Sequence, residues 1–170
     1  MTTLAQLIAD TERQLRQAGV GFGHGTTNAH DEAAWLVLHA LGLPLDTELD
    51  GSEGNQPIAL EPSARAATLL RARIDTRKPL AYLTGEAWLQ GVPFTVDERV
   101  IIPRSQIAET IADGSIDPWL SEKTRKVLDL CTGNGSLAVL AAMAWPDVQV
   151  DAADISRDAL DVARLNVQRH

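Results

Sequence analysis

The chain has 170 residues, a net charge of −8, an apolar content of 45% and one cysteine, which suffices for one ordinary domain or two small ones around a real core. The acidic balance excludes a protein held on nucleic acid by non-specific phosphate contacts, and the single cysteine excludes an internal disulfide and suits a reducing cytoplasm. No apolar run is long enough to span a bilayer and the first residues lack a secretory signal, so we expect a cytoplasmic protein without a membrane partner or direct sequence-specific nucleic-acid binding.

Residues 1–78 are predicted to form a small helical bundle. The first helix covers residues 2–18, where apolar residues recur every three or four positions and Gly19 ends the pattern. Asn28 or Thr27 caps a second helix, and Gly42 and Pro44 end it.

A third helix is expected to open at Pro62, because proline suits the first turn of a helix, where no N–H donor is needed. A loop covering 44–60 precedes it. The residues expected on the buried helix faces are Leu4, Leu7, Ile8, Leu15 and Ala18 in the first helix, Ala33, Leu36, Val37, Ala40 and Leu41 in the second, and Ala67, Leu70 and Ile74 in the third.

Charge is distributed unevenly along this bundle. Seven acids and no Lys or Arg occur between Gln17 and Ala64, and a group of five basic residues follows. The group is either a solvated helix face or a docking patch for an acidic or RNA-rich partner, and the sequence leaves both readings open. Its members are Arg65, Arg71, Arg73, Arg77 and Lys78.

Residues 79–122 are expected to form a β-hairpin and a connector. The first arm is 86–89, Gln90-Gly91 makes the turn, and the second arm runs from 92 to 102. Alternation in the second arm predicts one buried face. That face carries Phe94, Val96, Val100 and Ile102.

The hairpin leads into a short helix. Ser105 can cap it, and Ile107 and Ile111 are its apolar residues. The connector that follows, 113–125, is expected to contain a helical turn near Trp119.

Residues 123–170 read as the beginning of an α/β domain. A buried strand at 126–130 leads through a glycine turn into a helix at 136–144, and a second strand at 148–153 leads into a helix capped by Ser156. The apolar residues of this last helix are Leu160, Val162, Ala163 and Leu165.

The glycine turn is the candidate binding site. Gly133, Gly135 and Ala138 fit the G-x-G-x-x-G/A spacing of loops that hold nucleotide-like ligands at a helix N-terminus. Asp154 follows Gly135 by nineteen residues and can accept hydrogen bonds from both ribose hydroxyls of an adenosine. This pattern fits NAD as well as S-adenosylmethionine.

Asp129, immediately before the turn, separates the two ligands. A carboxylate there repels the pyrophosphate of NAD, whereas S-adenosylmethionine has no phosphate and carries an ammonium group and a sulfonium charge. Two structural alternatives stay open, in which Asp129 caps the turn and Asp154 marks the entry into a helix. Cys131 is either a nucleophile or a small loop residue whose backbone faces the ligand.

The four histidines lack metal-ligand spacing with cysteine or acids, so no metal site is expected. They are interpreted as surface or core residues. They are His24, His30, His39 and His170.

Several longer segments resemble the protein-glutamine methyltransferases, which modify release factors and a ribosomal protein. The segments are 79–88 (PLAYLTGEAW), 91–96 (GVPFTV) and 97–105 (DERVIIPRS). The loop 129–135 (DLCTGNG) is similar to the cofactor motif of the family, and 154–160 (DISRDAL) to its second acidic motif.

Two branches of this family compete. Release-factor enzymes typically have Pro-Arg-Pro where Pro103-Arg104-Ser105 stands here, and glycine at the position of Cys131. The sequence therefore looks closer to the branch that acts on a large-subunit ribosomal protein. The resemblance implies S-adenosylmethionine as cofactor and that ribosomal protein as partner.

The family fold implied is α/β: an N-terminal helical bundle for substrate recognition, a linking β-hairpin, and then the first part of a class I (Rossmann-like) methyltransferase sheet. By the same resemblance Pro103 and Arg104 lie near the cofactor or the active-site entrance, and Arg104 is alternatively a structural ion-pair partner. Asp154 is implied to hold the ribose. The residues implied to line the methionine end of the cofactor are Asp129, Cys131, Thr132, Gly133, Asn134 and Gly135.

The sequence departs from the family in one respect. The Asn-Pro-Pro-Tyr motif, which accepts the two hydrogens of the substrate amide in the family, is absent, and no Asn-Pro pair occurs anywhere. We therefore assign no catalytic residue, and we expect this chain to be the N-terminal portion of a longer enzyme and inactive alone. A non-enzymatic ribosome-associated adaptor, a release-factor enzyme and a nicotinamide-dependent enzyme are the alternatives.

Overall fold

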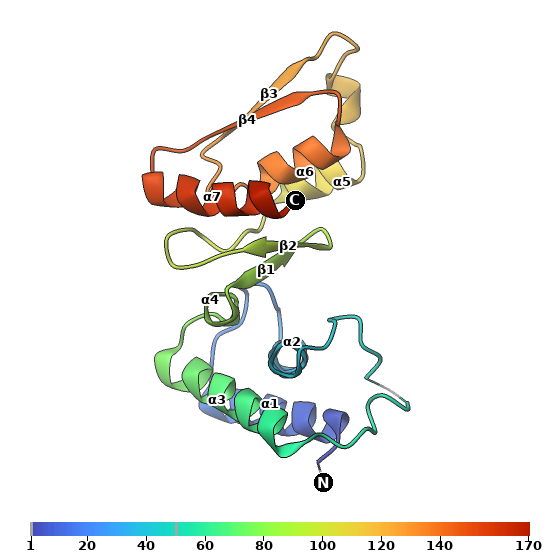
Figure 1. Ribbon diagram of the computed structural model, residues 1–170, viewed down its shortest axis with the longest axis vertical. Helices are drawn as coiled ribbons and strands as arrows, with labels where there is room; N and C mark the ends of the chain where they lie inside the picture. Colours follow the sequence, from blue (N-terminus) through green and yellow to red (C-terminus); the bar gives the residue numbers. More distant parts are fainter. Residues whose placement is uncertain (1, 50) are drawn as a thin grey trace. The chain divides into compact units, whose positions relative to one another are not determined.

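The computed structural model describes residues 2–49 and 51–170, which form two compact units (Figure 1). One unit lies within the first 84 residues, and the other comprises residues 85–170 and includes the hairpin. The α/β class, with a helical bundle, a hairpin and a strand–helix–strand–helix segment in this order, is confirmed. The three domain ranges expected from the sequence stay a prediction.

The first unit contains α1 (Leu4–Ala18), α2 (Ala29–Leu41), α3 (Leu60–Thr76) and the short α4 (Leu80–Thr84), which the sequence did not indicate. Thr3 and Gln6 form a capping box at the start of α1, and Gly19 ends the helix in the left-handed conformation at φ 59°. Helix α1 packs against both α2 and α3. The first predicted helix is therefore confirmed.

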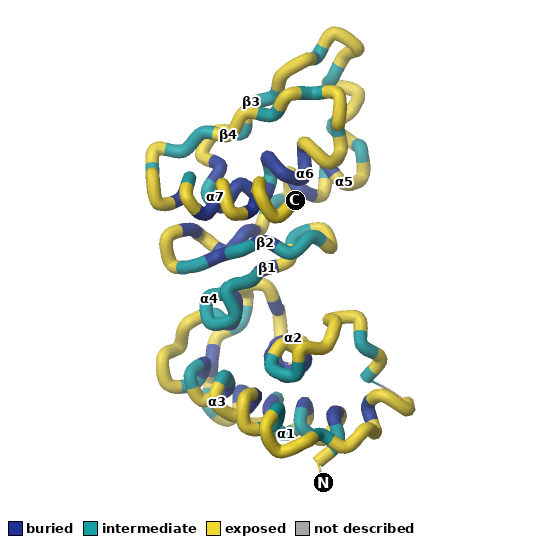
Figure 2. The backbone as a smooth tube through the Cα atoms, viewed as in Figure 1, coloured by how far each residue is buried: buried dark blue, intermediate teal, exposed yellow. Residues whose placement is uncertain are grey.

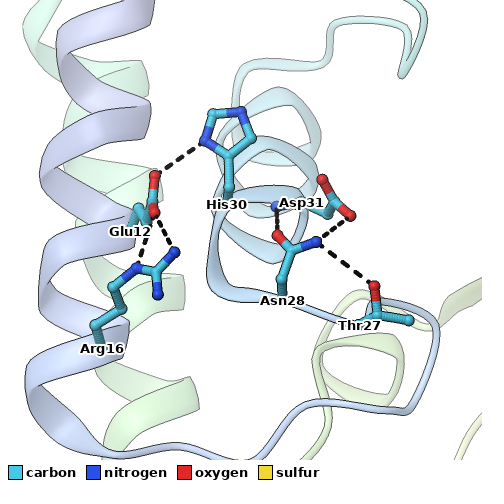
Figure 3. Close-up of polar contacts among 6 residues, drawn as sticks. All are labelled: Glu12, Arg16, Thr27, Asn28, His30 and Asp31. Atoms are coloured by element: carbon cyan, nitrogen blue, oxygen red, sulfur yellow. Dashed lines mark hydrogen bonds and ion pairs between the residues drawn. The ribbon is translucent and has the colours of Figure 1, made fainter.

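Asn28 caps α2, as one of the two predicted alternatives (Figure 3). Its side-chain oxygen accepts the Asp31 N–H at 2.9 Å, and Gly42 ends the helix at φ 70°. The interior of the unit is mostly apolar, and Figure 2 shows its buried residues, in dark blue, on the facing sides of the helices. Its most deeply buried large side chains are Leu4, Leu15, Leu36, Val37, Leu38 and Leu80.

The predicted inner face of α3 is partly wrong. Leu70 is buried, but Ala67 is exposed and Ile74 only half-buried, while Ala66 and Arg73 point inward. The buried face is rotated by one residue because Arg73 pairs with the buried carboxylate of Glu32. An alanine pair at 66 and 67 gave the hydrophobic pattern no means of choosing between the two faces.

At least three of the five basic residues around α3 make contacts within this unit. Arg73 is 3% exposed, so neither a solvated face nor a docking patch includes it. Arg65 donates to the Ala40 carbonyl at 3.0 Å, and Arg77 donates to the Ala18 carbonyl at 2.8 Å. These carbonyls lie in the last turns of α2 and α1, where helices lack internal donors.

The second unit begins with the antiparallel hairpin of β1 (Glu86–Leu89) and β2 (Val92–Thr95). The predicted second arm is too long, because β2 ends at Thr95 rather than at 102. The carboxylate of Asp97 accepts the Arg99 N–H at 3.0 Å and folds the chain into a turn. The predicted apolar face is nevertheless buried at Phe94, Val96, Val100 and Ile102.

Helix α5 (Gln106–Ala112) follows, and the Ser105 hydroxyl accepts the Ile107 N–H as predicted. The side chain of Ile107 is 53% exposed, so Ala108 and Ile111 form the buried face. A 3-10 turn, η1 (Asp117–Trp119), lies near the predicted position. The core of the unit comprises Phe94, Ala108, Ile111, Val139, Leu140 and Ala141.

Strands β3 (Lys126–Leu130) and β4 (Gln149–Ala153) pair in parallel, and each leads into a helix, α6 (Ser136–Ala144) and α7 (Arg157–Arg169). Both helices lie on one side of the strands (Figure 1). β3 is not a buried strand, since Leu128 and Leu130 are 61% and 70% exposed on the other face. In the part of the chain that the structure describes, this sheet has no further strand or covering element on that face.

Candidate functional site

The glycine loop joins β3 to α6 at the edge where the carboxyl ends of both parallel strands lie. The Thr132 N–H donates to the Ala153 carbonyl at 3.0 Å, which attaches the loop to the end of β4. The Gly135 N–H donates to the Thr132 carbonyl at 2.9 Å and closes the turn. This edge is where open α/β sheets bind nucleotide-like ligands.

Three loop residues have positive φ, namely Cys131 at 62°, Gly133 at 57° and Gly135 at 79°. A side chain at Gly135 would lie 3.1 Å from the Cβ of Ala163, so this glycine allows the loop to approach α7. At Gly133 a Cβ would meet no atom within 4 Å. One glycine therefore faces the protein and the other faces open space, where a ligand can approach the backbone.

Asp154, at the end of β4, accepts hydrogen bonds through both carboxylate oxygens. Oδ1 accepts the Ser156 N–H and Oδ2 accepts the Gly133 N–H, each at 2.9 Å. These two bonds hold the pKa of the Asp154 carboxyl below its usual value. Asp154 thus has the helix-entry role that the sequence left open. Each oxygen still has accepting capacity for ligand hydroxyls.

Asp129, at the end of β3, is half-buried beneath the loop. Its Oδ2 accepts the Thr132 hydroxyl at 2.5 Å, so the turn-capping alternative is also realised. No hydrogen bond to its Oδ1 occurs among residues 2–49 and 51–170. That oxygen can accept a cationic or N–H group of a ligand.

Asn134 lies between the two glycines and is only 3% exposed. Its side-chain oxygen accepts the Ser136 N–H at 3.2 Å, and its carbonyl accepts a bond from Asn166 at 2.8 Å. The side-chain nitrogen has no partner within the described parts of the chain. The side chain of Asn134 is therefore directed into the protein. Cys131 is exposed.

Pro103 and Arg104 occupy the segment before α5. Pro103 is buried and Arg104 is exposed. Arg104 makes no ion pair within the portion of the chain that is described, so the structural ion-pair alternative is not supported. Pro103 can position this segment through packing, while the guanidinium of Arg104 is accessible to a ligand.

Asn166 is a site-related residue that the sequence reading missed. It is 0% exposed and lies on the core face of α7, one turn beyond Val162 and Ala163. A buried polar side chain on an apolar helix face must find hydrogen-bond partners, and Asn166 finds them in the glycine loop and in β2. The signal that could have found Asn166 is its position, three and four residues after the apolar Ala163 and Val162 on the predicted helix.

Two of the four histidines, His30 and His170, make side-chain contacts within the protein. His30 contacts the Glu12 carboxylate at 2.9 Å (Figure 3), and the His170 ring contacts the Pro93 carbonyl at 2.8 Å. In the described residues no three His, Cys, Asp or Glu side chains are grouped so that they could hold a metal ion. No helix in those same ranges is long and apolar enough to cross a membrane.

Comparison with known proteins agrees with this geometry. Residues 116–170, which contain the glycine loop and Asp154, match the family described as methyltransferase small domain. The whole chain is 49% identical to a ribosomal protein uL3 glutamine methyltransferase of Bordetella pertussis, over 100% of this chain and 57% of that protein.

The chain is also similar to proteins of the same name in two other organisms. The protein of Burkholderia pseudomallei is 48% identical, over 96% of this chain and 53% of that protein. The protein of Neisseria meningitidis serogroup A is 44% identical, over 99% of this chain and 55% of that protein. The predicted resemblance to protein-glutamine methyltransferases is confirmed. The chain spans a little over half the length of these curated relatives.

Proposed function

We infer that this chain carries the cofactor-holding part of a protein-glutamine methyltransferase of the kind that modifies ribosomal protein uL3. The similarity to such enzymes extends over the whole chain at 43–49% identity. The observation that carries the proposal is the glycine loop with its two acids. Asp154 accepts the Gly133 N–H, and Asp129 accepts the Thr132 hydroxyl.

S-adenosylmethionine is the cofactor that these residues fit best, and it supplies the methyl group when bound. Gly133 leaves open space beside the loop, which a nucleoside-like ligand requires. The ionised Asp154 suits the ribose hydroxyls, and the uncommitted oxygen of Asp129 suits the ammonium of the methionine part. NAD would bring its pyrophosphate toward Asp129, where like charges repel.

The substrate we propose is a glutamine side chain of a large-subunit ribosomal protein. The nitrogen of an amide is a poor nucleophile, so an enzyme must orient it toward the methyl carbon. The Asn-Pro-Pro-Tyr motif that does this in the family does not occur in this sequence. The residues present therefore hold the methyl donor, and we expect no methyl transfer by the 170-residue chain alone. A cytoplasmic location fits such a substrate.

Calorimetry on the chain tests the cofactor. We expect binding of S-adenosylmethionine, weaker or absent binding of NAD, and loss of S-adenosylmethionine affinity in Asp129→Asn and Asp154→Asn. Asp151→Asn is the matched control, because Asp151 is an exposed acid within β4, the strand that leads directly to Asp154. Tight NAD binding that is unchanged in Asp129→Ala would contradict the proposal.

The substrate needs a second experiment, with the full-length enzyme. Methyl transfer from labelled S-adenosylmethionine is measured on uL3 and on a release factor side by side. We expect the label on a uL3 glutamine, because the similar curated proteins carry that name. Label on the release factor alone would assign the other branch, and label incorporated by the 170-residue chain would refute its predicted inactivity.

A further inference from the structure

The side chain of Asn166 joins three parts of the second unit. It projects from α7, is 0% exposed, and makes three hydrogen bonds to main-chain groups of other segments. Its Oδ1 accepts the Thr95 N–H at 2.7 Å, and its Nδ2 donates to the Thr95 carbonyl at 3.0 Å and to the Asn134 carbonyl at 2.8 Å. The donors and acceptors of this one amide are thus shared between β2 and the glycine loop.

At β2, Asn166 acts as a peptide group of a neighbouring strand would. It satisfies both main-chain polar groups of Thr95, the last residue of the strand. Two further contacts join the end of α7 to the hairpin, since Arg169 pairs with Glu86 at 2.6 Å and the ring of His170, directly after the helix, contacts the Pro93 carbonyl. The end of α7 is therefore bound to the hairpin through polar contacts on one helix face.

At the loop, Asn166 holds the carbonyl that lies between Gly133 and Gly135. One turn earlier on α7, Ala163 forms the surface against which Gly135 packs, and a Cβ at Gly135 would lie only 3.1 Å from the Ala163 Cβ. Helix α7 therefore fixes the loop twice, by close packing at Ala163 and by a hydrogen bond at Asn166. A loop with three residues of positive φ needs such external contacts to keep one conformation.

We propose that Asn166 is a positioning residue. Its hydrogen bonds hold the glycine loop, the proposed cofactor site, in a fixed position relative to the hairpin that leads to Pro103 and Arg104. This inference rests on the proposed function, because it takes the glycine loop as the cofactor site. Asn166 itself need not touch the cofactor. Its effect passes through the Asn134 carbonyl to the loop, where Gly133 faces open space.

The amide of Asn166 both accepts from the Thr95 N–H and donates to the carbonyls of Thr95 and Asn134. A carboxylate in Asn166→Asp keeps the acceptor for the Thr95 N–H but faces the carbonyls of Thr95 and Asn134 without a donor. A leucine removes all three bonds at similar volume, and a serine leaves space and at most part of the network. The three variants therefore separate loss of the donor from loss of the whole network.

The experiment compares these variants with Val162→Ala in the 170-residue chain. Val162 is also 0% exposed on α7, and its side chain has no polar atom, so its truncation removes buried apolar surface but none of the three hydrogen bonds of Asn166. We measure S-adenosylmethionine affinity by calorimetry, stability by urea unfolding, and amide hydrogen exchange at Gly133 and Gly135 by NMR. If Asn166→Leu does not fold, Asn166→Asp and Asn166→Ser still decide the outcome.

We expect Asn166→Asp and Asn166→Ser to weaken cofactor binding about tenfold and to speed exchange at the Gly135 amide by at least about tenfold. Val162→Ala, at a comparable loss of stability, should leave both the cofactor affinity and the exchange rate of the Gly135 amide within about twofold of those of the original chain. A purely structural role would make the variants and the control alike, and that result would overturn the inference. If the original chain binds no S-adenosylmethionine, the proposed function fails, while the exchange rates still decide whether Asn166 orders the loop.

Discussion

Asp154 accepts a hydrogen bond from the main-chain N–H of Gly133 at 2.9 Å, so an acid at the end of one strand orders the loop that follows the other. The two residues are far apart in sequence and meet because β3 and β4 run parallel and end at the same edge. The same carboxylate starts α7 by accepting the Ser156 N–H. The glycine loop and the start of α7 are therefore both hydrogen-bonded to one carboxylate.

This arrangement predicts how the site responds to pH. The N–H groups of Ser156 and Gly133 lower the pKa of Asp154 in the folded chain, so the unfolded chain binds the proton more readily. The stabilising contribution is present above the unfolded pKa, about 4, and is lost as pH falls through the lower folded pKa. Hydrogen exchange at the Gly133 amide, corrected for its intrinsic pH dependence, should rise in this window.

Asp154→Asn should remove that acid transition, because the amide does not titrate. Asp151→Asn should keep it, since among the described residues the Asp151 carboxylate accepts a bond only from the Gln149 side chain on the same strand. A protection factor at Gly133 that falls equally with pH in the original chain and in Asp154→Asn would show that another group controls the loop.

Gly135 and Gly133 should differ when each is replaced by alanine. Both have positive φ, which costs an alanine about 1–2 kcal/mol. At Gly135 the new methyl group also lies 3.1 Å from the Ala163 Cβ, and overpacking adds about 1–3 kcal/mol. Urea unfolding should therefore show a clearly larger loss for Gly135→Ala. Equal losses would mean that α7 can move away from the loop at little cost.

Glu12 should contribute little to stability despite two partners. Its carboxylate contacts His30 and Arg16 (Figure 3), but these two side chains are 55% and 62% exposed. The hydrogen bond of His30, followed by that of Arg16, lowers the pKa of Glu12, so this contribution is present above the ordinary Glu pKa and is lost as pH falls through the folded one. Glu12→Gln should cost less than about 1 kcal/mol in urea unfolding at neutral pH. A loss of several kcal/mol would indicate a role in the bundle beyond a surface contact.

The local elements were accessible from the sequence because their signals are local. Asn28, Ser105 and Ser156 each cap the helix that follows, and Gly19 ends the one before it. The glycine turn between β3 and α6 likewise has a spacing that few other structures require. Caps, turns and glycine spacing depend on neighbouring residues, so a single sequence suffices to find them.

The errors concern contacts between distant residues. The inward turn of Arg73 depends on Glu32, forty-one positions away, and the importance of Asn166 depends on Thr95, seventy-one positions away. β3 was expected to be buried because its residues are apolar, yet burial of Leu128 and Leu130 requires a covering element that the described residues do not provide. The hydrophobic pattern indicates which face of a helix or strand is apolar, but it does not indicate which distant residues that face contacts.

The Glu32–Arg73 pair should be the most sensitive polar contact of the first unit. The two side chains are 4% and 3% exposed, and Arg73 Nε lies 2.7 Å from Glu32 Oε1. The Thr26 hydroxyl donates to the same carboxylate at 3.1 Å, and Arg73 also donates to the Gly21 carbonyl at 2.7 Å. The pair thereby joins α2, α3 and the loop after α1 into one network.

Removal of one partner leaves a buried charge without its counter-ion, so Arg73→Met or Glu32→Leu should each cost about 3–5 kcal/mol in urea unfolding. The double variant should lose much less than the sum of the two, because it leaves no unpaired charge. The exposed pair Arg65–Glu61, with side chains 50% and 86% exposed, is the control, and Arg65→Met should cost less than about 1 kcal/mol through that pair. Additive losses at 32 and 73 would contradict the coupling, since each residue would then act through separate contacts.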